Sequence, residues 1–168
     1  ALTGLYNRTA LREAYSSLGR ADDLLTCVHC FDLDGFKEIN DRFGHAVGDA
    51  LLAGIAERLR ESLEPPAIAV RIGGDEFVIL QPDVRDPAEA ENLARQILSV
   101  LGRPYRLVAE EITIGISLGY TMALAGSAEL DHMMASADKA SYRAKRNGGG
   151  IDRELPPTLD LGKFSLVA

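Results

Sequence analysis

The strongest constraint on the fold is a nearly continuous apolar run from Leu24 to Phe31, which ends at Asp32. An apolar run this short is typical of a strand buried inside a sheet. An amphipathic helix is expected before it. The apolar side of that helix consists of Leu11, Ala14, Tyr15 and Leu18. The first part of the chain therefore predicts a helix followed by a central strand.

Three further segments have the apolar spacing of helices. Apolar residues repeat every four positions over residues 47–63, and Pro65-Pro66 ends that helix. Residues 90–101 carry a second helical stripe, which ends at Gly102. Residues 130–144 form the last predicted helix, in which the methionines fill the core.

Two hairpins are expected between these helices. Residues 67–72 and 77–80 are strand-like, and the Gly73-Gly74 step between them supplies the positive φ of a tight turn. Residues 105–108 and 112–121 predict the second hairpin, around a polar turn at Glu110.

Helices that alternate with a central strand and two hairpins imply an α/β sandwich. Its sheet is expected to be mixed but mostly antiparallel, with helices on its faces. The 168 residues, 46% of them hydrophobic, fit one globular domain. Regular patterning ends at Gly148-Gly149-Gly150. We therefore expect one domain over residues 1–149, with residues 150–168 forming a linker or the start of a following domain.

The charge balance argues against polyanionic partners. A net charge of -7 repels DNA, RNA and anionic membranes, so no nucleic acid polymer and no membrane contact are expected. No apolar stretch reaches the roughly 20 residues that span a bilayer, and no signal-peptide pattern opens the chain. The expected location of this segment is cytoplasmic, although regions outside it could anchor a full-length protein to a membrane.

Cys27 and Cys30 form a C-x-x-C pattern that raises the alternatives of a zinc site or a redox pair. A tetrahedral zinc site needs a second Cys or His pair, and a redox pair is expected at a strand-to-helix turn. The pair lies inside the apolar run instead. We interpret both residues as core residues of a buried strand.

Asp32 is the first candidate for chemistry, because it stands where the buried strand ends and a helix opens after Gly35. A carboxylate beside a helix N-terminus suits a metal ion that bridges to phosphate. Asp34 has two interpretations. It is expected to cap the helix, in preference to binding the metal.

The turn Gly73-Gly74-Asp75-Glu76 carries two adjacent carboxylates. Alone, this stretch has ordinary turn composition. Combined with Asp32 and the backbone carbonyl of Leu33, it would give Mg²⁺ a set of oxygen ligands with positions left for phosphate. Neither a P-loop nor a dinucleotide-binding glycine motif is present in the sequence. The histidines His29 and His132 are interpreted as structural.

Several motifs resemble, in order, those of the GGDEF family of diguanylate cyclases. They are Leu2-Thr3-Gly4-Leu5-Tyr6-Asn7-Arg8, the stretches 31–41 and 44–49, Arg71-Ile72-Gly73-Gly74-Asp75-Glu76-Phe77, Ala137-Asp138 and Tyr142-Arg143-Ala144-Lys145. This resemblance covers residues 1 to about 149. It implies a palm-like fold shared with adenylate cyclases and polymerases, including a GGDEF hairpin. It also implies that two GTP molecules are joined into cyclic di-GMP, the 3′-hydroxyl of each attacking the α-phosphate of the other.

The resemblance also implies roles for single residues. Asp32, the Leu33 carbonyl and Asp75 would bind Mg²⁺, for which Mn²⁺ could substitute. Asp75 would help to deprotonate the 3′-hydroxyl, and Glu76 would support it. The expected substrate-binding residues are Gly35, Phe36, Lys37, Asn40, Asp49, Gly74 and Lys145. Of these, Asn40 and Asp49 would read guanine, because a carboxylate can accept hydrogen bonds from the N1–H and N2–H groups on its edge. Lys37 and Lys145 would contact the triphosphate.

The sequence departs from the family pattern at two places. Gly149 stands where the family has a second cation, an arginine, with Arg146 as a partial substitute. Glu64-Pro65-Pro66-Ala67 stands where the family has the R-x-x-D of its product-inhibition site, so that site is not expected.

Two functions therefore stay open. The first is an active cyclase that works as a homodimer, with a sensor domain on its N-terminal side. The alternative is a catalytically weak GTP-binding domain that regulates an attached domain, such as an EAL phosphodiesterase domain. Residues 159–166 weakly resemble the start of such an EAL domain.

Overall fold

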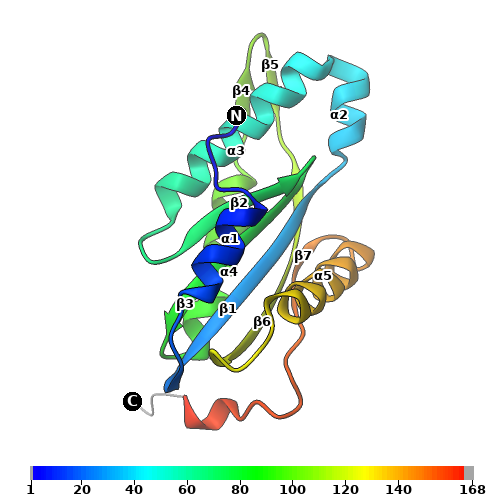
Figure 1. Cartoon of the computed structure of the whole chain (residues 1–168). Coiled ribbons are helices and arrows are strands. Elements are labelled where there is room, and N and C mark those ends of the chain that lie inside the picture. The colour runs from blue at the N-terminus through cyan, green and yellow to red at the C-terminus, as the bar shows by residue number, and fades with distance from the viewer. Residues whose placement is uncertain (1, 165–168) are drawn as a thin grey trace.

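The computed structural model describes residues 2–164, which form a five-stranded sheet covered by helices on both faces (Figure 1). The strands of this sheet are β1 (Ala21–Asp34), β2 (Ile68–Gly73), β3 (Glu76–Val84), β6 (Gly115–Ala125) and β7 (Gly150–Arg153). Their order is β2-β3-β1-β6-β7, and only the β6–β7 pair is parallel. The predicted mixed, mostly antiparallel sheet is confirmed.

The helices are α1 (Arg8–Ser16), α2 (Phe36–Phe43), α3 (His45–Ser62), α4 (Pro87–Leu101) and α5 (Leu130–Arg146), with a short 3-10 helix η1 (Leu161–Lys163). Buried residues of α3 and α4 pack on one face of the sheet, against Leu25, Cys27 and Phe31. Buried residues of α1 and α5 pack on the other face, against Val28 and Cys30. β1 is thus covered on both faces, as its continuous apolar run predicts.

Cys27 and Cys30 are core residues on opposite faces of the sheet, which confirms their interpretation as core residues. Side chains alternate along a strand, so two residues three positions apart point to opposite sides. His29 is fully buried beside Tyr120, and its Nε2 lies 2.9 Å from Oε1 of Gln81. His29 is therefore part of the core, as expected from its place in the strand.

The predicted second hairpin is wrong in its second strand. The structure pairs β4 (Tyr105–Leu107) with β5 (Glu110–Ile112), and the turn lies at Val108, whose φ is 56°. β6 starts at Gly115 and pairs along its whole length with β1. The single apolar pattern over 112–121 thus spans two strands, because β6 is buried on both faces and shows no alternation at its start.

The segment from Gly150 on, expected to be a linker or the start of a following domain, forms a strand and packs on the sheet. Residues 150–153 pair with β6 in parallel, and Phe164 is buried in the core. Arg143 of α5 forms ion pairs with Asp152 (2.9 Å) and Glu154 (2.8 Å) of this segment. The domain boundary at 149/150 stays a prediction.

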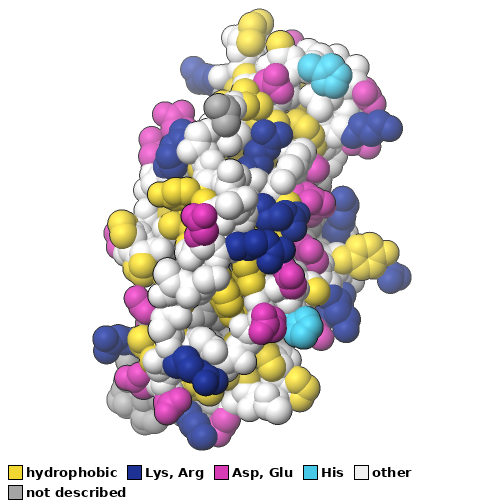
Figure 2. All heavy atoms as spheres, in the orientation of Figure 1, with side chains coloured by type: hydrophobic (Ala, Val, Ile, Leu, Met, Phe, Trp, Pro, Cys, Tyr) yellow, Lys and Arg dark blue, Asp and Glu magenta, His cyan; other side chains and the backbone are white. Residues whose placement is uncertain are grey.

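The surface carries both signs of charge. Figure 2 shows acidic and basic side chains mixed across the face that bears α1 and α5. Within the described residues, no helix combines the length and the apolarity that crossing a bilayer requires.

Candidate active site

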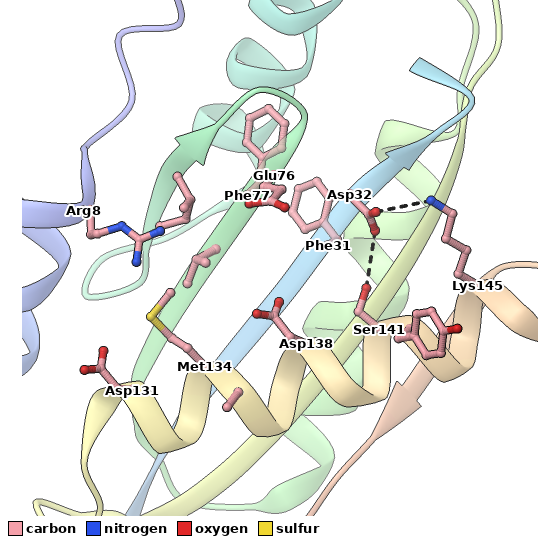
Figure 3. A pocket seen from close by; sticks show the side chains of 14 residues that line it. Arg8, Phe31, Asp32, Glu76, Phe77, Asp131, Met134, Asp138, Ser141 and Lys145 are labelled. Atoms are coloured by element: carbon pink, nitrogen blue, oxygen red, sulfur yellow. Dashed lines mark hydrogen bonds and ion pairs between the residues drawn. The ribbon is translucent and has the colours of Figure 1, made fainter. Parts of the chain in front are cut away.

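The candidate site lies where β1 and β3 meet the Gly73-Gly74 turn. Asp32 of β1 is paired directly with Glu76 of β3 on one side and with Ser117 of β6 on the other. Residues that are directly opposite in a sheet project to the same face. Asp32 and Glu76 therefore both face the side covered by α5, as Figure 3 shows.

Helix α5 brings a cation and a hydroxyl to Asp32. Nζ of Lys145 lies 3.5 Å from Oδ2 of Asp32, and Oγ of Ser141 lies 3.5 Å from Oδ1 of the same carboxylate (Figure 3). The sequence predicted that Asp32 and Lys145 would act in one site. The structure brings their side chains together across the β1–α5 interface.

A pocket of about 550 Å³ opens between α1, α5 and the ends of β1 and β3. This volume is in the range of ordinary ligand sites. Among the residues with predicted roles, Asp32, Glu76 and Lys145 line it. Its wall also includes Arg8, Asp131, Asp138, Ser141 and Tyr142. The pocket therefore combines carboxylates with cations from two helices.

Asp138 is the acid of this wall with a perturbed pKa. The pKa of Asp138 is raised, mainly because the carboxyl group is partly buried. The charge of Asp32 adds to this shift, whereas a hydrogen bond from Cys30 and the charge of Arg8 oppose it. Burial is also the main reason why the pKa of the Cys30 thiol is raised well above its ordinary value. Burial is therefore the main cause of both shifts, and the charge of Asp32 adds to the shift of Asp138.

Asp34 does not cap helix α2, so the expected cap is wrong. The residue before α2 is Gly35, which has a φ of 76° and caps without a side chain. The Asp34 carboxylate instead accepts hydrogen bonds from Ser117 Oγ, at 2.9 and 3.1 Å. Asp34 is the last residue of β1 and points across the sheet to β6, because its backbone continues the strand and does not turn into the cap position.

The two predicted guanine readers lie where α2 and α3 meet. Asn40 is on α2 and Asp49 on α3, and the side chain of Asn40 lies directly over Gly48. A Cβ atom at position 48 would overlap Asn40 Oδ1. Gly48 is therefore required for Asn40 to lie beside the first turn of α3, one residue from Asp49. Asp49 itself is exposed.

Four further predicted residues lie outside the pocket wall. Phe36 and Lys37 begin α2, and Lys37 is exposed. Gly74 and Asp75 form the hairpin tip, where Gly74 has a φ of 51° and its carbonyl accepts a hydrogen bond from Arg71 Nε at 2.9 Å. None of these four residues is among those that line the pocket. The structure thus divides the predicted site into a pocket, a hairpin tip and a helix junction.

The predicted ligands have the chemistry of a magnesium site in which a substrate supplies the remaining oxygen ligands. Carboxylates of Asp32 and Asp75 and the carbonyl of Leu33 are hard oxygen donors of the kind that Mg²⁺ prefers. Within residues 2–164, no three His, Cys, Asp or Glu side chains are grouped to hold a metal unaided. An ion there would need further oxygens from phosphate or water, which is usual for Mg²⁺.

The two sequence departures lie at well-defined turns. Gly149 has a φ of 99° and its N–H donates to the carbonyl of Ala144 at 2.8 Å, so it ends α5 in a backbone conformation that side chains rarely adopt. Glu64 and Ala67 close the other turn, in which Ala67 N–H donates to the Glu64 carbonyl at 3.0 Å.

Sequence reasoning missed the hydroxyl of Ser141 and gave Asp138 no role. A signal was available in the spacing along α5, since Met134, Asp138, Ser141 and Lys145 follow each other at intervals of three or four residues. This spacing places them on one face of a helix. Both polar residues interrupt what was interpreted as an apolar stripe.

Known proteins resemble this chain in sequence. The family described as "Diguanylate cyclase, GGDEF domain" matches residues 1–150. Protein y4lL of Sinorhizobium fredii is 41% identical over 162 residues, covering 95% of this chain and 20% of that protein. MucR of Pseudomonas aeruginosa, named a bifunctional diguanylate cyclase/cyclic di-GMP phosphodiesterase, is 39% identical over 127 residues, covering 76% of this chain and 18% of that protein. Several other relatives are named diguanylate cyclases.

Solved structures show the same likeness. The GGDEF domain of PA1120 (TpbB or YfiN) from Pseudomonas aeruginosa superposes with a TM-score of 0.78 and 32% identity, covering 97% of this chain and 95% of that one. The chain spans about a fifth of the length of the two curated relatives described above.

Proposed function

This chain belongs to the GGDEF family of diguanylate cyclases, and on that basis we propose that it condenses two GTP molecules into cyclic di-GMP and two pyrophosphates. The resemblance seen in the sequence and the palm-like α/β fold are confirmed by the comparisons. The reaction, the metal and the dimer are the proposal.

The observation that supports it most is the meeting of Asp32, Glu76 and Lys145 at one pocket. Two carboxylates from neighbouring strands and an ammonium from a helix suit a metal-bound polyphosphate. The half-exposed Lys145 can turn from Asp32 to a phosphate oxygen, because its side chain is long and carries its charge at the tip.

The 3′-oxygen of one GTP bonds to the α-phosphorus of the other, and the bond from that phosphorus to the bridging oxygen breaks, so pyrophosphate leaves. Asp75 at the hairpin tip accepts the proton of the 3′-hydroxyl. Bound Mg²⁺ would offset the negative charge of the phosphate oxygens. A second transfer between the same two nucleotides closes the ring.

Guanine selectivity is assigned to the junction of α2 and α3. Asp49 and Asn40 supply oxygen acceptors, and guanine has N1–H and N2–H donors on an edge where adenine lacks them. The side chain of Asn40 lies over Gly48, the residue that precedes Asp49 in α3. GTP is therefore expected to bind in preference to ATP.

Two copies of the domain must act together, because each is proposed to hold one GTP and the product contains two. In this proposal the two pockets face each other in an antiparallel homodimer. A sensor on the N-terminal side of the full protein would control how often the copies meet.

A second function has its own observation. Gly149 cannot supply the arginine expected there, and its φ of 99° disfavours any side chain at that position. A catalytically weak GTP-binding domain that regulates an attached EAL phosphodiesterase domain or another domain would fit this departure.

Incubation with GTP and Mg²⁺, followed by chromatography of the nucleotides, separates the two functions. If the protein is a cyclase, cyclic di-GMP is expected from the chain itself and from two copies of it joined by a leucine zipper. A zipper-joined dimer that binds GTP and yields no product would favour the regulatory function.

A further inference from the structure

Helix α5 lies unusually close to the sheet beside the candidate site. A Cβ atom at Gly119 of β6 would overlap the backbone of Ala137 and Ser141. The buried side of α5 here consists of small residues, Ala137, Ala140, Ser141 and Ala144. Small residues on both sides let the helix backbone rest directly on the strand. A side chain as short as serine therefore reaches the carboxylate at the end of β1.

Ser141 is nearly fully buried, with 6% of its surface exposed, and its hydroxyl has two acceptors within reach. Oγ lies 2.8 Å from the carbonyl of Ser117 and 3.5 Å from Oδ1 of Asp32. A hydroxyl has one proton, which rotates to suit its surroundings. That proton can be directed to either acceptor, and a small shift of Asp32 toward the helix would make the charged carboxylate the stronger one.

Two side chains of the described residues contact the Asp32 carboxylate through hydrogen bonds or ion pairs, and they differ in kind. Lys145 is 51% exposed at its side chain and reaches Asp32 from the solvent side. Ser141 reaches it from the buried side on a rigid, short side chain. If Lys145 turns to a phosphate, Ser141 remains as the protein group that fixes Asp32 Oδ1.

We propose that Ser141 is a positioning residue for Asp32, which holds Oδ1 toward the helix and leaves Oδ2 free for the metal ion. This inference rests on the proposed function in one respect, the role of Asp32 as a metal ligand. Groups that orient a metal ligand from behind change metal affinity by about 10- to 100-fold when they are removed.

The test measures metal binding directly. Free and bound Mn²⁺ are quantified by electron paramagnetic resonance while the metal is titrated into the protein with a non-hydrolysable GTP analogue. Ser141→Ala is expected to weaken Mn²⁺ binding about tenfold. Ser141→Thr, which keeps the hydroxyl, is expected to stay within about threefold of the parent protein.

The matched control is Ser136→Ala, on the same helix but outside the pocket wall. It makes the same chemical change, so its Mn²⁺ affinity and melting temperature should equal those of the parent. Equal Mn²⁺ affinity for Ser141→Ala and Ser136→Ala would overturn the proposal. So would equally weak binding by Ser141→Thr and Ser141→Ala when both melt at the parent temperature.

The outcomes also separate this inference from the proposed function. Mn²⁺ binding that depends on both Asp32 and Ser141, in a protein that makes no cyclic di-GMP, would support the inference and contradict the cyclase. Mn²⁺ binding to the parent protein that Asp32→Asn leaves unchanged would contradict both.

Discussion

Lys145 Nζ and Asp32 Oδ2 lie 3.5 Å apart although 113 residues separate them in the chain. This contact joins the last helix to the end of the central strand. It places the ammonium group of a half-exposed lysine beside a carboxylate of the pocket wall.

Replacement of Asp75 by Asn should lower cyclic di-GMP synthesis by more than about a hundredfold, since it removes a charged ligand and the proton acceptor together. Asp32→Asn should behave alike. Both variants should melt within a few degrees of the parent protein. Asp22→Asn, an exposed position on the same strand as Asp32, is the control and should keep full activity. Activity of Asp75→Asn within about tenfold of the parent would contradict the assignment.

Two substitutions test whether the junction of α2 and α3 recognises guanine. Asp49→Ser removes the acceptor for the guanine edge and should reduce the preference for GTP over ATP about tenfold or more. Gly48→Ala leaves Asp49 in place but displaces Asn40, because its Cβ would overlap Asn40 Oδ1. It should therefore lower GTP affinity too. Competition binding with both nucleotides measures these effects, and Gly19→Ala, whose added Cβ would meet no atom within 4 Å, controls for the added methyl group. An unchanged preference in Asp49→Ser and in Asn40→Ala would show that guanine is read elsewhere.

Assembly should limit the rate, because one domain is proposed to hold one GTP. The activity per molecule of the isolated segment should fall as the protein is diluted over about a hundredfold range, and fusion to a zipper should remove this dependence. The measurement is initial rate against protein concentration at saturating GTP. A flat specific activity in the unfused protein would argue that a single copy suffices.

His29 should make stability depend on pH. Burial lowers its pKa from 6.5 to about 4, with the hydrogen bond to Gln81 opposing the shift. The unfolded chain therefore binds a proton below pH 6.5 that the folded chain resists, so stability is lost as the pH falls from 6.5 toward 4. Between about pH 7.5 and about pH 5, this effect amounts to about 2 kcal/mol of unfolding free energy.

Urea denaturation of His29→Leu tests this effect. The loss of stability between the two pH values should shrink by about 2 kcal/mol relative to the parent protein. The exposed His132, replaced by Gln, is the control and should leave the loss unchanged. An identical pH dependence in parent and His29→Leu would place the acid sensitivity in another group.

Much of the fold could be predicted because its signals are local. The apolar run at 24–31 has the length that is typical of a buried strand, and Gly73-Gly74 between two strand-like runs predicts a hairpin. The strand at 150–153 could not be predicted in this way. It is short, begins with a glycine and forms by parallel pairing with β6, a contact that no local pattern encodes.

The site follows the same division. Asp32 was identified because the apolar run predicts that a strand ends there, although β1 continues to Asp34. The roles of Asn40 and Asp49 came from the family resemblance alone. Ser141 was missed because its place at the carboxylate depends on how closely α5 approaches Gly119. That distance is set by packing between two segments far apart in the chain.

The most direct test of the central claim is the stoichiometry of the reaction with GTP and Mg²⁺ in a zipper-joined dimer. Cyclic di-GMP and pyrophosphate are quantified in the same samples, for the parent protein and for Asp32→Asn. The proposed cyclase reaction predicts two pyrophosphates for each cyclic di-GMP in the parent protein and no product above background in the variant. GTP that is bound but not converted by the parent dimer, or product formation that Asp32→Asn leaves intact, would contradict it.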